Sequence, residues 1–76
     1  MFTITSWSIT SPGGLKVFSC ILKPDLGRSF FSVVVPFKFS DSSKKIINQV
    51  ARILEIKDTE VSWREDLQKP EDVHQG

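Results

Sequence analysis

The stretch from residue 29 to residue 40, SFFSVVVPFKFS, most restricts what this chain can fold into. Its bulky apolar side chains recur at every second position, which is the period of a β-strand with one buried face. These side chains are Phe31, Val33, Val35, Phe37 and Phe39. Pro36 interrupts the segment, and proline in a sheet is confined to edge strands and bulges because it has no backbone N–H. We therefore predict a strand that lies at a sheet edge or bends out of the sheet at Pro36.

Residues 2–10, FTITSWSIT, are predicted to form a strand as well, because threonine, isoleucine and aromatic residues suit a pleated surface. The apolar side chains change parity within this segment. A bulge near Thr5 and Ser6 would let every one of them face the core. They are Phe2, Ile4, Trp7 and Ile9. Alternatively, the first residues fray and only the later part of the segment pairs.

Residues 15–23, LKVFSCILK, are predicted to form a strand between these two, and both of its faces are substantially apolar. Turn sequences flank it, SPGG on one side and PDLGR on the other. Gly13 and Gly27 can adopt the positive φ that such turns require. Because the connections are short, the three strands are expected to form an antiparallel meander.

The hydrophobic period changes to that of a helix after residue 40, and Ser40 or Asp41 is expected to cap the helix. Its apolar stripe consists of Ile46, Ile47, Val50, Ile53 and Leu54. The alternation of Thr59, Val61 and Trp63 then predicts a fourth short strand, with a short helix capped by Asp58 as the alternative.

The predicted fold class is therefore α+β, in the order βββαβ. It consists of a three-stranded antiparallel meander, one helix packed on one face and a fourth short strand. We expect residues 1–66 to form the single domain and residues 67–76 to form a polar, disordered tail.

The residues that usually carry catalysis are scarce. The single histidine, His74, lies in the polar tail, so no serine is expected to have a base beside it. Cys20 is the single cysteine, and its position within a strand indicates a buried, inert thiol. One cysteine and one distant histidine cannot supply a four-ligand zinc site. We predict no enzymatic activity, no cofactor, no metal and no small-molecule substrate.

The sequence carries no pattern of membrane insertion. No segment approaches the roughly 20 apolar residues of a membrane-spanning helix. The first residues, MFTITSWSIT, lack the positive start and continuous apolar run of a signal peptide. A lone cysteine is typical of a reducing compartment. We therefore expect a cytoplasmic protein without membrane contact.

One helix covers only one face of a three-stranded sheet, so the other face is expected to expose an apolar patch. The expected function is that of a regulator, inhibitor or accessory subunit. It would dock on a protein partner, or on a second copy of itself, through that face or a strand edge. The expected partner-binding residues are Lys16, Phe18, Arg28, Phe30, Val34 and Lys38. In the alternative, the loops and the C-terminal segment with Trp63 cover this face.

A second hypothesis is a DNA-binding domain that lays its three-stranded sheet on nucleic acid. Residues 1–54 carry seven basic against two acidic side chains, whereas residues 55–76 carry three against seven. This asymmetry is compatible with a basic binding face. The basic residues are scattered, however, and form no dense stripe. A protein partner is therefore preferred over nucleic acid.

Overall fold

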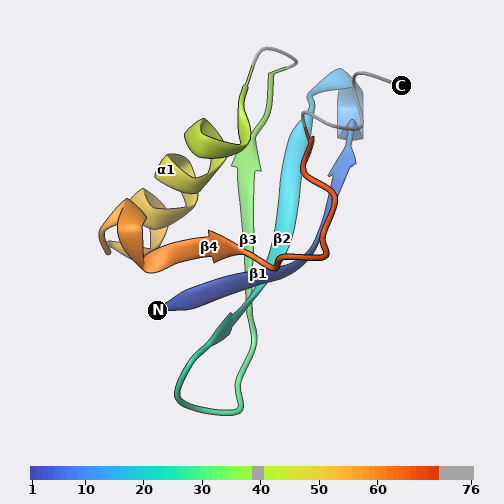
Figure 1. Cartoon of the computed structure of the whole chain (residues 1–76). Helices are drawn as coiled ribbons and strands as arrows, with labels where there is room; N and C mark the ends of the chain where they lie inside the picture. The colour runs from blue at the N-terminus through green and yellow to red at the C-terminus, as the bar shows by residue number, and fades with distance from the viewer. Residues whose placement is uncertain (39–40, 71–76) are drawn as a thin grey trace.

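The computed structural model describes residues 1–38 and 41–70, which form a four-stranded sheet with one helix against it (Figure 1). Across the sheet, the strands run in the order β3 (Phe31–Pro36), β2 (Val17–Pro24), β1 (Phe2–Thr10) and β4 (Val61–Trp63). β2 pairs antiparallel with both β1 and β3, while β4 lies parallel to β1. With helix α1 (Ser43–Leu54) between β3 and β4, the predicted βββαβ order is confirmed.

β1 contains the predicted bulge. Its register against β2 shifts between Ile4 and Ser6, and the hydroxyl of Thr5 donates a hydrogen bond of 3.2 Å to the carbonyl oxygen of Ile21. The extra residue changes which side of the strand faces the core. Ile4 before the bulge and Trp7 after it consequently both pack in the core.

Helix α1 begins after Ser42, whose side chain accepts a hydrogen bond of 3.2 Å from the backbone N–H of Lys45. The prediction of Asp41 as the cap was wrong. Its carboxylate instead accepts from the backbone N–H of Lys38 at 3.0 Å and pairs with the Lys45 ammonium at 3.1 Å. Asp41 therefore fixes the chain that enters the helix. The other predicted cap, Ser40, lies outside the described residues.

The apolar stripe of α1 packs on the sheet as expected, with one exception. Ile46 and Val50 are buried, and Ile47 and Leu54 are partly buried against the same core. Ile53 is 52% exposed, so it does not belong to the buried stripe. No helix in the described part of the chain is long and apolar enough to cross a membrane.

β3 presents its apolar side chains to α1 over most of its length. Val33, Val35 and the following Phe37 are buried. Phe31 lies beyond the cover of the helix, is 43% exposed, and meets the ring of Phe2 edge-on with the ring centroids 5.8 Å apart. Phe39, the last residue of the predicted alternation, lies outside the described residues.

Phe18 lies at the centre of the core and is 0% exposed. Its ring stacks on Trp7 and Phe37, with centroid distances of 5.7 and 6.5 Å. Trp63 meets it edge-on at 5.9 Å. The prediction of Phe18 as a partner-binding residue was therefore wrong, because the register of β2 turns this side chain toward the helix.

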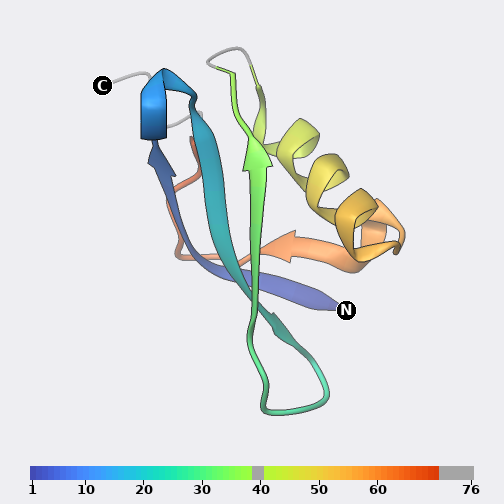
Figure 2. The same cartoon turned by 180° about the vertical axis from the view of Figure 1, so that it is seen from behind.

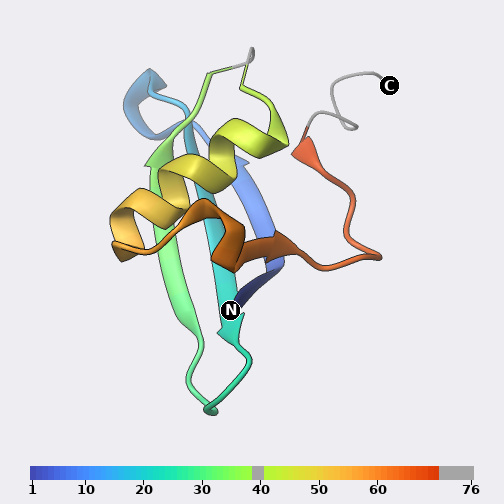
Figure 3. The same cartoon turned by 60° about the vertical axis from the view of Figure 1, so that its left-hand side comes forward.

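Both interpretations of the segment after α1 are partly correct. One 3-10 turn, Asp58–Glu60, leads directly into β4. The chain then runs along the helix side of β1, as Figure 3 shows, where the Trp7 indole N–H donates to the Gln68 carbonyl oxygen at 2.7 Å. Pro70 is buried, so the packed part of the chain continues past residue 66. The remainder of the expected tail, 71–76 with His74, lies outside the described residues.

The end of α1 provides a prediction about stability. Glu55 has a φ of 59° and a ψ of 41°, the left-handed conformation, which costs a residue with a Cβ about 1–2 kcal/mol. Glu55→Gly removes that cost but adds backbone entropy to the unfolded chain. We expect the free energy of unfolding to rise by about 0.5–1 kcal/mol, measured by urea unfolding. Glu55→Ala, which keeps the Cβ, should gain much less. Equal effects of the two variants would contradict this explanation.

Candidate protein-docking surface

β3 lies at one edge of the sheet, so half of its backbone groups face outward. The N–H of Phe37 donates to the carbonyl oxygen of Lys16 at 3.1 Å, which shows that odd-numbered residues of this segment pair with β2. Because the direction alternates along a strand, Ser32, Val34 and Pro36 point their backbone groups away from the sheet. Pro36 therefore occupies a position at which the hydrogen bonds between β2 and β3 do not need a backbone N–H. Of the two alternatives predicted for Pro36, the edge strand is confirmed.

We call the side of the sheet opposite α1 the open face. In Figure 2, α1 lies beside β3 and no helix crosses in front of the three long strands. Trp63 and Leu67 pack with the core on the other side, so the cover of this face by Trp63, which the alternative expected, is not formed by the described residues. The open face carries Thr3, Ser6, Ser8 and Thr10 from β1, Val17, Ser19, Ile21 and Lys23 from β2, Phe30 just before β3, and Ser32, Val34 and Pro36 from β3.

Three large apolar side chains are exposed on the open face. Ile21 is 41% exposed, Val34 55% and Phe30 60%. Ile21 pairs with Ser32 and Ser19 pairs with Val34, so Ile21 and Val34 are diagonal neighbours across the two strands. Polar hydroxyl side chains surround them. An apolar centre with a polar rim is the usual anatomy of a protein–protein contact surface.

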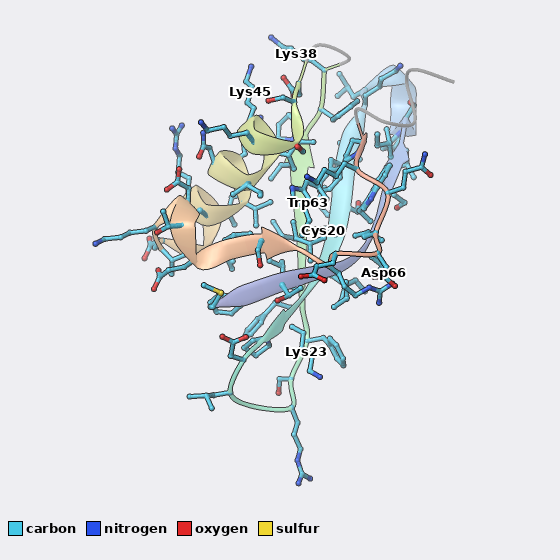
Figure 4. All side chains as sticks on the ribbon, viewed as in Figure 1. Cys20, Lys23, Lys38, Lys45, Trp63 and Asp66 are labelled. Atoms are coloured by element: carbon cyan, nitrogen blue, oxygen red, sulfur yellow. The ribbon has the colours of Figure 1, made fainter. Side chains whose placement is uncertain are left out.

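The structure brings only two of the predicted partner-binding residues together, Phe30 and Val34. Lys16 is half-buried just before β2, and Arg28 lies in the loop between β2 and β3. Lys38 follows the opposite end of β3 and lies near Lys45, as Figure 4 shows. The predicted basic residues therefore do not form one patch.

Ile21 was missed by the sequence interpretation. The second strand is apolar on both parities, so nothing in its own pattern shows which set faces the helix. The pairing of Phe18 with Val35 decides it, since residues paired across a sheet share a face.

A hollow of about 710 Å³ lies at the end of the open face beside the β2–β3 loop. Phe30 forms an apolar wall, Lys23 and Arg64 contribute positive charge, and Asp25 contributes negative charge. Pro24 and the hydroxyl-bearing Thr3, Thr5 and Ser6 complete the lining. Lys23 lies at this end of the sheet, far from Lys38 and Lys45 (Figure 4). A shallow hollow of mixed polarity suits a protruding side chain of a partner.

Cys20 lies in the core on the helix side of β2 and is 2% exposed. Burial raises the pKa of its thiol to about 11, so the reactive thiolate is scarce near neutral pH. We expect 5,5′-dithiobis(2-nitrobenzoic acid) to label it orders of magnitude more slowly in the native protein than in urea. The labelling is measured by absorbance at pH 8. Fast labelling of the native protein would show that the core opens readily at β2.

The described residues contain no group of three or more His, Cys, Asp or Glu side chains placed to hold a metal ion. What they do present is a candidate contact surface: an open face with an apolar centre, a hollow at one end, and the free edge of β3. A surface of this kind can bind another macromolecule. The chain itself matches no protein-family model, no curated protein and no solved structure.

Proposed function

We propose that this chain is a small non-enzymatic binding protein that acts as a regulator, inhibitor or accessory subunit. It docks on a protein partner through the open face and the adjoining edge of β3, or on a second copy of itself through the open face. The exposure of Ile21, Phe30 and Val34 on the sheet face that α1 leaves uncovered supports this function most directly. A cytoplasmic location is part of the proposal and is supported by the single cysteine.

The test uses two variants of the open face, Phe30→Asp and Val34→Asp. Each side chain is more than half exposed, so we expect each variant to change the free energy of unfolding by no more than about 1 kcal/mol. Each introduced charge should nevertheless reduce binding at least tenfold, because it would have to be desolvated in the complex. Leu15→Asp is the matched control, since Leu15 is an exposed apolar residue in the β1–β2 turn.

Wild type and the three variants serve as immobilised bait in a lysate of the source cell, with quantitative mass spectrometry of captured proteins. Sedimentation velocity tests whether a second copy is the partner. A partner retained by Leu15→Asp and lost by Phe30→Asp and Val34→Asp supports the proposal. Equal capture of the same proteins by wild type and all three variants contradicts the proposal. It is also contradicted if none of the four captures a protein and the wild type is a monomer at every concentration. Unfolding of Val34→Asp would show that the open face is part of the core.

Nucleic acid remains the second candidate because the strand side chains of the open face include hydroxyls and Lys23 but no carboxylate. Hydroxyl side chains commonly donate hydrogen bonds to phosphate oxygens. Fluorescence anisotropy with a labelled random DNA duplex separates the two functions. Binding that weakens steeply as salt increases would favour nucleic acid, and no binding at low salt would exclude it.

A further inference from the structure

A groove of about 560 Å³ lies between the free edge of β3 and helix α1. β3 contributes Val35 and Pro36 to its lining. The helix contributes one stripe of residues spaced three and four apart, Lys45, Asn48, Gln49, Arg52 and Ile53. In Figures 1 and 2, α1 lies beyond β3 on the side away from β2. The groove therefore adjoins the strand edge that has no neighbour in the sheet.

The free edge can accept an added strand along a short length. Ser32 and Val34 direct both N–H and C=O outward, whereas Pro36 offers only its carbonyl oxygen. An extended peptide can form ladder hydrogen bonds with these groups and place alternate side chains in the adjoining groove. Pro36 limits the pairing, so the edge favours a short segment over a long strand.

The groove is positively charged and has one apolar position. Lys45 and Arg52 line it, and no carboxylate does. Lys45 is partly neutralised by Asp41, but Arg52 has no carboxylate of the described residues within ion-pair distance. Ile53, half exposed, lies beside Arg52 in the lining. The complementary occupant is a segment that carries an acidic side chain for Arg52 and an apolar side chain for Ile53.

A second copy of this chain fits the groove poorly. Two β3 strands paired antiparallel about Val34 would place Pro36 opposite Ser32, whose outward carbonyl would then lack a donor. The same arrangement would bring two stripes containing Lys45 and Arg52 toward each other, and like charges repel. Both effects disfavour self-pairing at this edge.

We propose that the groove between β3 and α1 binds a short, extended, acidic segment of a protein partner as an added strand on β3. This inference rests on the proposed function, because it names the segment that the free edge would receive. The backbone of β3 supplies affinity, and Arg52 and Ile53 select the side chains. The groove shares only Pro36 with the open face, because the rest of its lining comes from Val35 and from α1.

The test begins with selection of a random-peptide display library on the immobilised protein. The enriched peptides are then synthesised with a fluorophore and titrated by anisotropy. We expect aspartate or glutamate to be enriched, with apolar residues two positions away. Arg52→Glu should weaken these peptides at least tenfold. Lys44→Glu is the matched control, because it makes the same charge change on an exposed residue of α1 outside the groove lining.

A second pair of variants tests the backbone contacts. Ser32→Pro removes one outward N–H and leaves the β2–β3 hydrogen bonds in place, whereas Ser32→Val keeps that N–H. We expect at least a tenfold loss for the proline variant and little loss for the valine variant, with urea unfolding to confirm that both fold. No enrichment of acidic peptides, or binding unaffected by Arg52→Glu and Ser32→Pro, overturns the inference. Loss of peptide binding with Phe30→Asp alone also overturns it, while leaving docking through the open face intact.

Discussion

Replacement of Phe18 by alanine is expected to lower the free energy of unfolding by about 3–5 kcal/mol, which is the usual cost of a large cavity in a core. Phe18 is completely buried and its ring contacts three other aromatic rings, those of Trp7, Phe37 and Trp63. A domain of 76 residues typically has only about 4–11 kcal/mol of stability in total. Phe18→Ala should therefore remove a large part of this stability.

Urea unfolding followed by tryptophan fluorescence measures this effect, because Trp7 and Trp63 both contact Phe18. Phe18→Leu fills much of the same volume and should lose less than half as much. Phe30→Ala is the control on the open face and should lose little, since Phe30 is mostly exposed. A Phe18→Ala variant that stays stable but binds its partner poorly would contradict the core position and support a role of Phe18 in binding.

Asp41→Ala is expected to lower the free energy of unfolding by about 2–3 kcal/mol at pH 7. The side chain of Asp41 is only 2% exposed and makes two charge-assisted contacts. Its loss leaves the backbone N–H of Lys38 without its carboxylate acceptor and the ammonium of Lys45 without its partner. Asp41→Asn keeps an oxygen acceptor for Lys38 and should lose about half as much.

The effect of Asp41 should depend on pH. Burial raises the pKa of this carboxyl, but the hydrogen bond from Lys38 and the charge of Lys45 outweigh it, so the pKa lies below its ordinary value of 3.8. A lowered pKa in the folded state stabilises the protein above the unfolded value, and this stabilisation is lost as the pH falls through the folded pKa. Urea unfolding should therefore show wild type and Asp41→Asn converging below pH 3.8. A difference that stays constant as the pH falls well below 3.8 would contradict the assigned contacts.

Local features of the sequence predicted the bulge and the edge strand. The change of parity between Ile4 and Trp7 can be seen in the residues themselves, and a bulge is the standard way to keep both on one face. Pro36 likewise restricts where its strand can lie, because a residue without a backbone N–H cannot occupy a position at which the sheet needs a hydrogen-bond donor. The helix was predictable for the same reason, since its apolar spacing is a property of neighbouring residues.

The predicted site was less accurate, because faces depend on register. Phe18 and Ile21 are both apolar residues of β2, but they point to opposite sides of the sheet. A slip of one residue in the pairing with β3 would exchange them. That register depends on the β2–β3 loop, which spans residues 25–30 and is longer than the expected turn at residues 24–28. The pattern of apolar residues within this strand therefore could not assign Phe18 to the core and Ile21 to the surface.

The groove between β3 and α1 likewise depends on tertiary structure. The spacing of Ile53 assigns it to the apolar stripe, but the way α1 packs on the sheet leaves it exposed. It lies beside Arg52 in the groove next to the edge of β3. The fourth strand pairs with β1 and leaves β3 free, a choice between two edges that no local pattern contains.

The sequence by itself thus determined the order of elements, indicated the bulge and limited the Pro36 strand to a sheet edge or a bend. These follow from backbone chemistry and short-range periodicity. Only the tertiary structure decided which face of β2 is buried, which edge is free and which side chains line the groove. Those outcomes depend on strand register and on the packing of α1, which join residues far apart in the chain.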